Sequence, residues 1–284
     1  MSKRGVALMG ICNVTPDSFS DGGDFFSREA AFSRVDLLLA EGADIVDIGG
    51  ESTRPAAPEV PPAEQLARVL DVVRHAAARC RERKNGCVSI DTQSPEVARA
   101  CLEAGAAVVN DVSCLRDDAL ARVTAEAHAA FVLMHSRGSQ ENMPGFGKAP
   151  ADAYGTDVVA TVAHEWSAAA ERALAQGVEK DVLYMDPGLG FAKAAPHSEE
   201  LLRRLTDLCR AVGAPVLVGA SRKSFLKLTD PDAEPRDRLG ASLAAAVYAA
   251  ANGAAIVRVH DVRATRQAID FMRRMQTPQQ GQVP

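Results

Sequence analysis

The feature that most constrains the fold of this 284-residue chain is a regular alternation between short apolar runs and longer amphipathic segments. Most short runs are rich in Val, Ile and Leu and are continuously apolar, which is typical of strands buried on both faces of a parallel sheet. We predict eight such strands: Val6–Val14, Asp44–Ile48, Cys87–Asp91, Ala107–Asn110, Ala130–His135, Val182–Asp186, Pro215–Gly219 and Ala255–His260.

The segments between these runs carry apolar residues at helical spacing. Their ends have the residues that begin and end helices: Ser94 precedes a first-turn proline, and Gly42, Gly105 and Gly177 follow periodic segments. We predict eight helices: Ser27–Glu41, Ala63–Arg83, Pro95–Ala104, Ala119–Ala127, Asp157–Gln176, Ser198–Val212, Arg236–Ala251 and Arg263–Met275.

Eight strand–helix pairs predict an α/β protein with one domain, a (β/α)8 TIM barrel over residues 1–277. The polar tail at 278–284 is expected to be frayed. The alternative is an open, doubly wound sheet, which normally carries a glycine fingerprint after its first strand. No such fingerprint follows Val14, so the barrel is favoured.

Charge and composition limit the partners of the protein. A formal net charge of −5 provides no basic field for nucleic acid. No apolar run reaches the ~18 residues of a membrane span, and Met1–Gly10 lacks the apolar stretch of a signal peptide. The six cysteines form no C-x-x-C pair and have no metal-ligand spacing. We therefore expect a soluble cytoplasmic protein that binds neither nucleic acid nor membrane.

Polar residues stand at the carboxyl end of every predicted strand, where the active sites of barrel enzymes lie. Four of them combine two carboxylates, one amide and one cation, a set that complements a flat heterocycle with an amino-amidine edge and a ring carbonyl. Met134 and Phe191 are placed to flank that ring. A single Asp there is as well explained by a turn, but eight converging ends favour a ligand. The four residues are Asp91, Asn110, Asp186 and Lys223.

A second group of polar residues is suited to an anion. It follows the last two strands, near the usual phosphate corner of a barrel, and includes residues of the first two loops. His260 alone is equally well explained as a packed histidine, and its place beside Arg258 favours a ligand role. No P-loop motif, protein-only metal site or nucleophile motif is present. The group comprises Asn13, Thr53, Arg54, Lys223, Arg258 and His260.

The strings at these strand ends resemble those of the dihydropteroate synthase family, in the same order. The resemblance extends from about Met9 to Met275. Two positions depart from the family pattern, Ala56 and Ala192, where glycine is usual. The strings are NVTPDSFSDGG, GGESTRP, IDT, ND, LMH, DPGLGF, GASRKSF and RVHDV.

The resemblance implies an enzyme that joins 6-hydroxymethyl-7,8-dihydropterin pyrophosphate to p-aminobenzoate and releases pyrophosphate. It implies a pterin pocket made by the first group and a pyrophosphate site made by Asn13, Thr53, Arg258 and His260, with a Mg²⁺ ion supported by Asn13. It implies a homodimer. The Ala-rich segment Leu239–Ala251 is apolar nearly all round, which suits a helix buried in an interface or, almost as well, one packed inside a monomer. The p-aminobenzoate pocket would comprise Phe19, Pro55, Lys223 and Ser224, and the catalytic residues Asp21, Lys223, Arg258 and His260.

Two other readings remain open. A pterin-dependent methyltransferase is similar in fold but binds no pyrophosphate, and the strings Ser221–Lys223 and Arg258–His260 favour the synthase. A catalytically silent homologue would not need the complete loop set that includes Asn13, Asp21 and Arg54.

Overall fold

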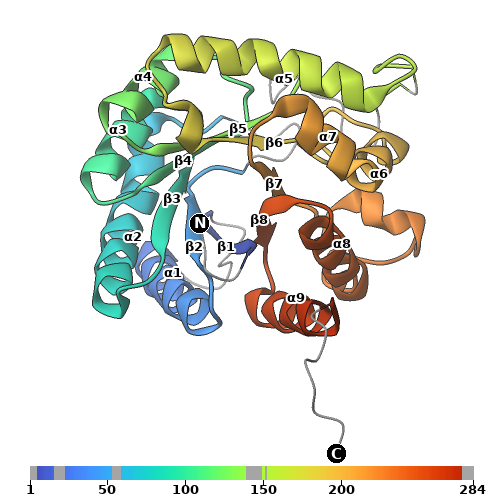
Figure 1. Ribbon diagram of the computed structural model, residues 1–284. Coiled ribbons are helices and arrows are strands. Elements are labelled where there is room, and N and C mark those ends of the chain that lie inside the picture. Colours follow the sequence, from blue (N-terminus) through green and yellow to red (C-terminus); the bar gives the residue numbers. More distant parts are fainter. Residues whose placement is uncertain (1–4, 16–22, 53–58, 139–148, 151, 277–284) are drawn as a thin grey trace, which may run out of the picture.

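The computed structural model describes residues 5–15, 23–52, 59–138, 149–150 and 152–276. Eight parallel strands form a closed barrel in chain order, and β1 pairs with β8 to complete it (Figure 1). The predicted (β/α)8 barrel is confirmed, and every predicted strand is found within two residues of its expected ends. The strands are β1 Ala7–Asn13, β2 Ile45–Gly49, β3 Cys87–Asp91, β4 Val108–Asp111, β5 Ala130–Met134, β6 Leu183–Asp186, β7 Val216–Val218 and β8 Ala254–Val259.

Helices surround the barrel, as Figure 1 shows. The caps that the sequence indicates are formed: the Oγ of Ser94 accepts a bond from the Val97 N–H at 3.3 Å, and Pro95 occupies the first turn of α3. The helices are α1 Gly23–Ala40, α2 Pro62–Arg83, α3 Pro95–Glu103, α4 Asp118–Glu126, α5 Val158–Ala175, α6 Ala195–Arg203, α7 Leu205–Val212, α8 Leu239–Ala251 and α9 Val262–Gln276, with short 3-10 turns η2 Lys180–Val182 and η3 Ser224–Leu228.

One segment predicted as a single helix is interrupted. The segment Ser198–Val212 is two helices, because Arg204 leaves the helical conformation with φ −100° and ψ 30°. Leu201, Leu205 and Leu208 are all fully buried. Their helical spacing continues across the break, so periodicity alone does not reveal it.

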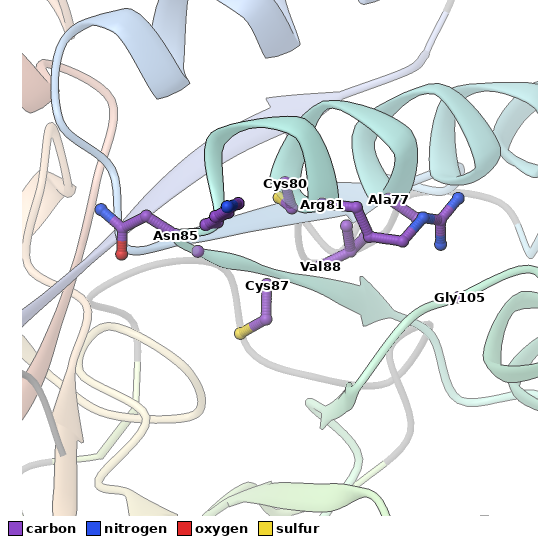
Figure 2. Close-up of a pocket in the computed structure, with 9 residues that line it drawn as sticks. Ala77, Cys80, Arg81, Asn85, Cys87, Val88 and Gly105 are labelled. Carbon is purple, nitrogen blue, oxygen red and sulfur yellow. The ribbon is translucent and has the colours of Figure 1, made fainter.

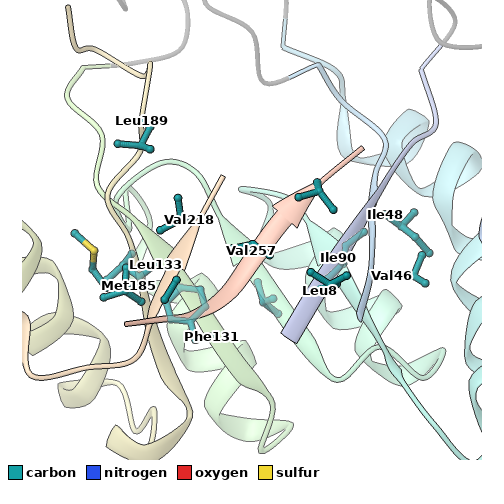
Figure 3. Packing of buried hydrophobic residues seen from close by; sticks show 14 of the residues in the cluster. Leu8, Val46, Ile48, Ile90, Phe131, Leu133, Met185, Leu189, Val218 and Val257 are labelled. Carbon is teal, nitrogen blue, oxygen red and sulfur yellow. The ribbon is translucent and has the colours of Figure 1, made fainter. Parts of the chain in front are cut away.

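The apolar core has an outer layer between strands and helices and an inner layer inside the barrel. Figure 3 shows outer-layer residues such as Val46, Ile48 and Ile90 on the strands. The inner layer consists of Met9, Ile45, Val108, Val132, Leu217 and Ile256. Because side chains alternate along a strand, Asp47 follows Ile45 on the inward face of β2. Toward the carboxyl ends of the strands the barrel interior therefore becomes polar.

A cavity of about 380 Å³ lies at the opposite end of the barrel, between α2 and the start of β3 (Figure 2). Its walls include Cys87 and Val88 at the amino end of β3, whereas Asp91 ends that strand on the far side. The cavity is thus separate from the polar end of the barrel. No described helix combines the length and apolar character needed to cross a membrane.

Candidate active site

Arg258 joins the polar residues of three strands inside the barrel. Its Nε donates to Asp47 Oδ2 at 2.6 Å, and its Nη2 donates to Asp91 Oδ2 at 2.8 Å. Asn110 donates from Nδ2 to the same Asp47 oxygen at 3.2 Å. Parallel register brings Gly49, Asp91 and Asn110 level with one another on β2, β3 and β4. The predicted pterin residues Asp91 and Asn110 are therefore neighbours.

Asp47 is a residue of this cluster that the sequence interpretation did not include. It is completely buried and binds both Arg258 and Asn110. The available signal was an acidic side chain in the middle of an otherwise apolar strand, because a carboxylate there must be paired. Asp91 Oδ1 and Asn110 Oδ1 are buried and have no partner among the described residues, so both remain acceptors for a ligand.

Burial raises the pKa of Asp91 from 3.8 to about 7. The positive charge of Arg258 lowers this pKa, while the negative charge of Asp47 raises it further. Two buried carboxylates share one guanidinium here, so ionisation of the second carboxylate is costly. The cluster keeps a proton up to about neutral pH in the absence of a ligand.

The protein is expected to lose stability as pH rises from about 4 to about 7, because Asp91 must ionise in its buried position. Its pKa of about 7 in the folded chain exceeds the ordinary value of 3.8, so the folded state binds more protons in this window and the free energy of unfolding falls with rising pH. Asp91→Asn removes the titrating group. Between pH 5 and pH 7.5, the free energy of unfolding measured in urea should fall less in the variant than in the wild type. An equal fall in both proteins would contradict the raised pKa of Asp91.

Asp186 and Lys223 lie near each other in the barrel mouth. Asp186 ends β6, and its Oδ1 accepts a bond from the Gly188 N–H at 2.7 Å. Lys223 Nζ donates to the Leu189 carbonyl at 2.6 Å. Gly219 lies between them, since a Cβ built on it would be 3.7 Å from Lys223 Nζ and 4.0 Å from Asp186 Oδ2. Burial lowers the pKa of Lys223 to about 8, and the Asp186 charge raises it.

Met134 and Phe191 pack together next to this pair. Both are buried, and they form a small cluster with Ala192. Lys223 Nζ stands 4.6 Å from the centre of the Phe191 ring, within cation–π range. Ala192 adopts φ 50°, the left-handed region that glycine enters at lower cost, so this departure from the family pattern occurs where the backbone conformation favours glycine.

His260 directly follows the end of β8, near Arg222, Arg258 and Asp261. Its backbone N–H donates to Ser221 Oγ at 3.3 Å, and its Nδ1 lies 3.1 Å from the same oxygen. Burial lowers the pKa of His260 to about 3, with further lowering by the charges of Arg222 and Arg258. The imidazole is therefore neutral. If the Ser221 hydroxyl donates to Nδ1, Nε2 carries the proton and is a donor for an anion.

Of the remaining predicted site residues, Asn13 and Ser224 lie within the described part of the chain. Asn13 is exposed at the end of β1, and Ser224 begins the five-residue turn η3, with Lys223 as its preceding cap residue. The other predicted residues lie outside the described residues, as does Ala56: Phe19, Asp21, Thr53, Arg54 and Pro55.

Comparison with known proteins shows which family the chain resembles. Residues 9–260 match the model of a family described as pterin binding enzyme. The dihydropteroate synthase of Mycobacterium leprae is 45% identical over 275 residues, which cover 95% of this chain and 93% of the relative. Two solved structures of Xanthomonas albilineans dihydropteroate synthase are also similar. One contains 4-aminobenzoic acid (40% identity, TM-score 0.85) and the other 7,8-dihydropteroate (37% identity, TM-score 0.83). Each alignment covers 96% of this chain and 94% of the other.

The barrel with a buried polar mouth and the match over residues 9–260 define a pterin-binding enzyme. Within that class the chain belongs to the dihydropteroate synthase family, and it is a transferase.

Proposed function

We propose that this protein condenses 6-hydroxymethyl-7,8-dihydropterin pyrophosphate with p-aminobenzoate to give 7,8-dihydropteroate and pyrophosphate. The observation that carries the proposal is the set formed by the buried Asp91, Asn110 and Asp186 and the half-buried Lys223 at one end of the barrel, with acceptor oxygens of Asp91 and Asn110 that have no partner among the described residues. The relative from M. leprae and the X. albilineans complexes with 4-aminobenzoic acid and 7,8-dihydropteroate support it.

The pterin would lie between two walls of the polar mouth. Asp91 and Asp186 accept its N–H groups, Asn110 meets an edge that has both donors and acceptors, and Lys223 donates to the ring carbonyl. Phe191 and Met134 provide apolar surface for the ring. A neutral Asp91 can donate one bond as well as accept one, and a cationic ligand edge would favour its ionised form.

The pyrophosphate would lie at the His260 corner. Arg222, Arg258 and Arg34 lower the pKa of His260 electrostatically and Asp261 raises it, so three guanidinium groups lie near this end of the mouth. Arg222 is itself fixed by two bonds to Asp261, at 3.1 and 2.6 Å. Donors already in place stabilise charge on a leaving group without reorganisation. Thr53 and Arg54 would add donors to this site.

Asn13 is suited to support a Mg²⁺ ion. Its side-chain amide oxygen is a hard ligand on an exposed strand end, and Mg²⁺ typically takes one or two protein oxygens together with substrate phosphates and water. No group of three His, Cys, Asp or Glu side chains that could hold a metal is present in the described parts of the chain. When bound, Mg²⁺ would neutralise charge on the pyrophosphate.

Departure of the pyrophosphate would lead the reaction, because the aromatic amine of p-aminobenzoate is a weak nucleophile. The electron-rich pterin shares the positive charge that develops at its methylene carbon, and Asp21 would stabilise that charge. Phe19, Pro55, Lys223 and Ser224 would hold p-aminobenzoate in line for attack on the methylene. Closure of the first loops would exclude water, which otherwise hydrolyses the cation.

The test is an assay of purified protein with the pterin pyrophosphate, Mg²⁺ and p-aminobenzoate. We expect pyrophosphate release that depends on p-aminobenzoate and an equal amount of dihydropteroate. Pterin binding without turnover would indicate a silent homologue. Absence of pterin binding would overturn the proposal, and methyl transfer to a corrinoid would identify the methyltransferase alternative.

We also propose that the protein is a cytoplasmic homodimer that associates through the outer face of α8. Ser242, Ala245 and Ala249 are buried, whereas Ala244 is exposed on the outward side and Leu239 and Tyr248, 39% and 41% exposed, lie at its two edges. An exposed apolar helix face suits an isologous contact with a second copy. The six cysteines are free thiols, which suits a reducing compartment.

A charged residue introduced on the outer face of α8 is expected to dissociate the dimer. Ala244→Glu places a carboxylate on the exposed side of α8, where it would be desolvated in a dimer. Ala168→Glu, at an exposed position of α5, is the matched control. Analytical ultracentrifugation should give a dimer for the wild type and the control and a monomer for Ala244→Glu. A dimeric Ala244→Glu protein would contradict the α8 contact.

A further inference from the structure

Lys193 is a lysine side chain that is almost completely buried, with 1% of its surface exposed. Its Nζ lies 2.9 Å from His135 Nδ1, and the carbonyl oxygens of Gly188, Phe191 and His135 lie at 3.2, 3.2 and 3.4 Å. An ammonium has three N–H donors, so these four acceptors use its whole capacity.

No carboxylate of the described residues lies within salt-bridge distance of this ammonium. Burial lowers the pKa of Lys193 to about 7, and the charge of Asp186 acts in the opposite direction. A buried cation without an adjacent counter-ion costs stability, and an apolar side chain of similar volume would avoid that cost. A buried residue that carries such a cost is a candidate for a role in the site.

His135 connects Lys193 to the protein surface. Its Nε2 lies 2.9 Å from Glu165 Oε2, and Glu165 in turn binds Arg137. Burial lowers the pKa of His135 to about 4, with the Lys193 charge lowering it further, so the ring is neutral. The neutral ring accepts from Lys193 at Nδ1 and donates from Nε2 to Glu165. This chain of bonds fixes the orientation of the acceptor that Lys193 contacts.

The acceptors of Lys193 are next to three residues of the pterin pocket. His135 directly follows Met134, the last residue of β5. The backbone N–H of Gly188 donates to Asp186, and the Phe191 carbonyl that accepts from Lys193 belongs to a pocket residue. The same loop presents the Leu189 carbonyl to Lys223. One ammonium therefore ties the end of β5 to the loop after β6, which carries Phe191 and contacts both Asp186 and Lys223.

We propose that Lys193 is a positioning residue of the pterin pocket, which holds the Gly188–Phe191 loop against the end of β5 so that Asp186, Lys223 and Phe191 face the pterin. This inference rests on the proposed function, because it assigns the loop to pterin recognition. Lys193 itself does not need to touch the ligand. Its removal should act through the geometry of residues that do.

The test compares Lys193→Met, which keeps the length and loses the donors, with Lys193→Gln, which keeps two N–H donors on a shorter side chain. Binding of the dihydropterin pyrophosphate is measured by calorimetry without p-aminobenzoate, well below each melting temperature. We expect Kd to rise roughly tenfold or more in the Met variant and less in the Gln variant, because small displacements of polar groups weaken binding strongly.

Ile269→Ala is the control for lost stability. Ile269 is fully buried on α9, so the cavity should lower the melting temperature without changing the pterin Kd. Lys180→Met, on an exposed turn, controls for the substitution itself.

The outcomes separate the two proposals. If the wild type neither binds pterin nor forms dihydropteroate, the proposed function fails whatever the variants do. If the wild type is active and both Lys193 variants bind pterin like the Ile269→Ala control, the positioning role alone is wrong. Failure of both Lys193 variants to fold would assign Lys193 to the stability of the barrel and would likewise overturn its role in the pocket.

Discussion

Asp186→Asn is expected to weaken binding of the dihydropterin pyrophosphate by roughly 10² to 10⁴-fold, on the basis of two lost hydrogen bonds to a charged group at about 1.5–3 kcal/mol each. The substitution keeps an oxygen that can accept from the Gly188 N–H, so the local loop should persist. It removes the charge that raises the pKa of Lys223, so the fraction of protonated Lys223 should fall as well. Calorimetric titration measures the effect.

Asp111→Asn is the matched control for Asp186→Asn. Asp111 is also a fully buried carboxylate at a strand end, but its oxygens accept bonds from Ser113 and the Leu115 N–H. This variant should lose stability and keep the pterin Kd of the wild type. If Asp186→Asn bound pterin as the wild type does, the assignment of the pocket would be wrong.

Gly188→Ala is expected to cost about 3–5 kcal/mol of stability and to abolish pterin binding. A Cβ at this position would lie 2.1 Å from the His135 carbonyl oxygen, a backbone atom that cannot move without displacing the end of β5. The backbone also has φ 63°, which an alanine adopts only with strain. The loop would have to leave β5, and it carries the contacts of Asp186, Lys193 and Lys223.

Gly213→Ala is the control that separates the cost of backbone strain from the cost of steric overlap at Gly188. Gly213 has φ 61°, nearly the same as Gly188, but no atom lies within 4 Å of a Cβ built there. Its replacement should cost only about 1 kcal/mol, from backbone strain alone. Urea unfolding of both variants gives the comparison, and equal losses would show that Gly188 does not hold the loop against β5.

Local sequence patterns predict the barrel well because each strand and helix has its own signal. The strand Cys87–Asp91 is found with the predicted bounds, and the cap at Ser94 is formed as expected. The adjacency of Asp91 and Asn110 follows from parallel pairing of consecutive strands. The break at Arg204 was not predictable from periodicity, since the buried leucines continue across it.

The contacts across the barrel could not be predicted in this way. Arg258 on β8 reaches Asp91 on β3, a pairing that depends on barrel closure and side-chain length. The roles of Asp47 and Lys193 were not predicted, because each is a single charged residue in an apolar or Gly-rich segment. Each contacts a partner far away along the chain, and local sequence patterns do not reveal such a contact. Single charges in buried segments are therefore worth treating as candidates before a structure is known.

The proposed function depends on recognition of the pterin by Asp91, Asn110, Asp186 and Lys223. A crystal structure of the protein with 7,8-dihydropteroate tests it most directly. We predict that the amino-amidine edge of the pterin binds the Asp91 and Asp186 carboxyl groups and Asn110, and that the ring carbonyl binds Lys223 Nζ. A product molecule whose pterin ring lies outside this set of four residues would contradict the account.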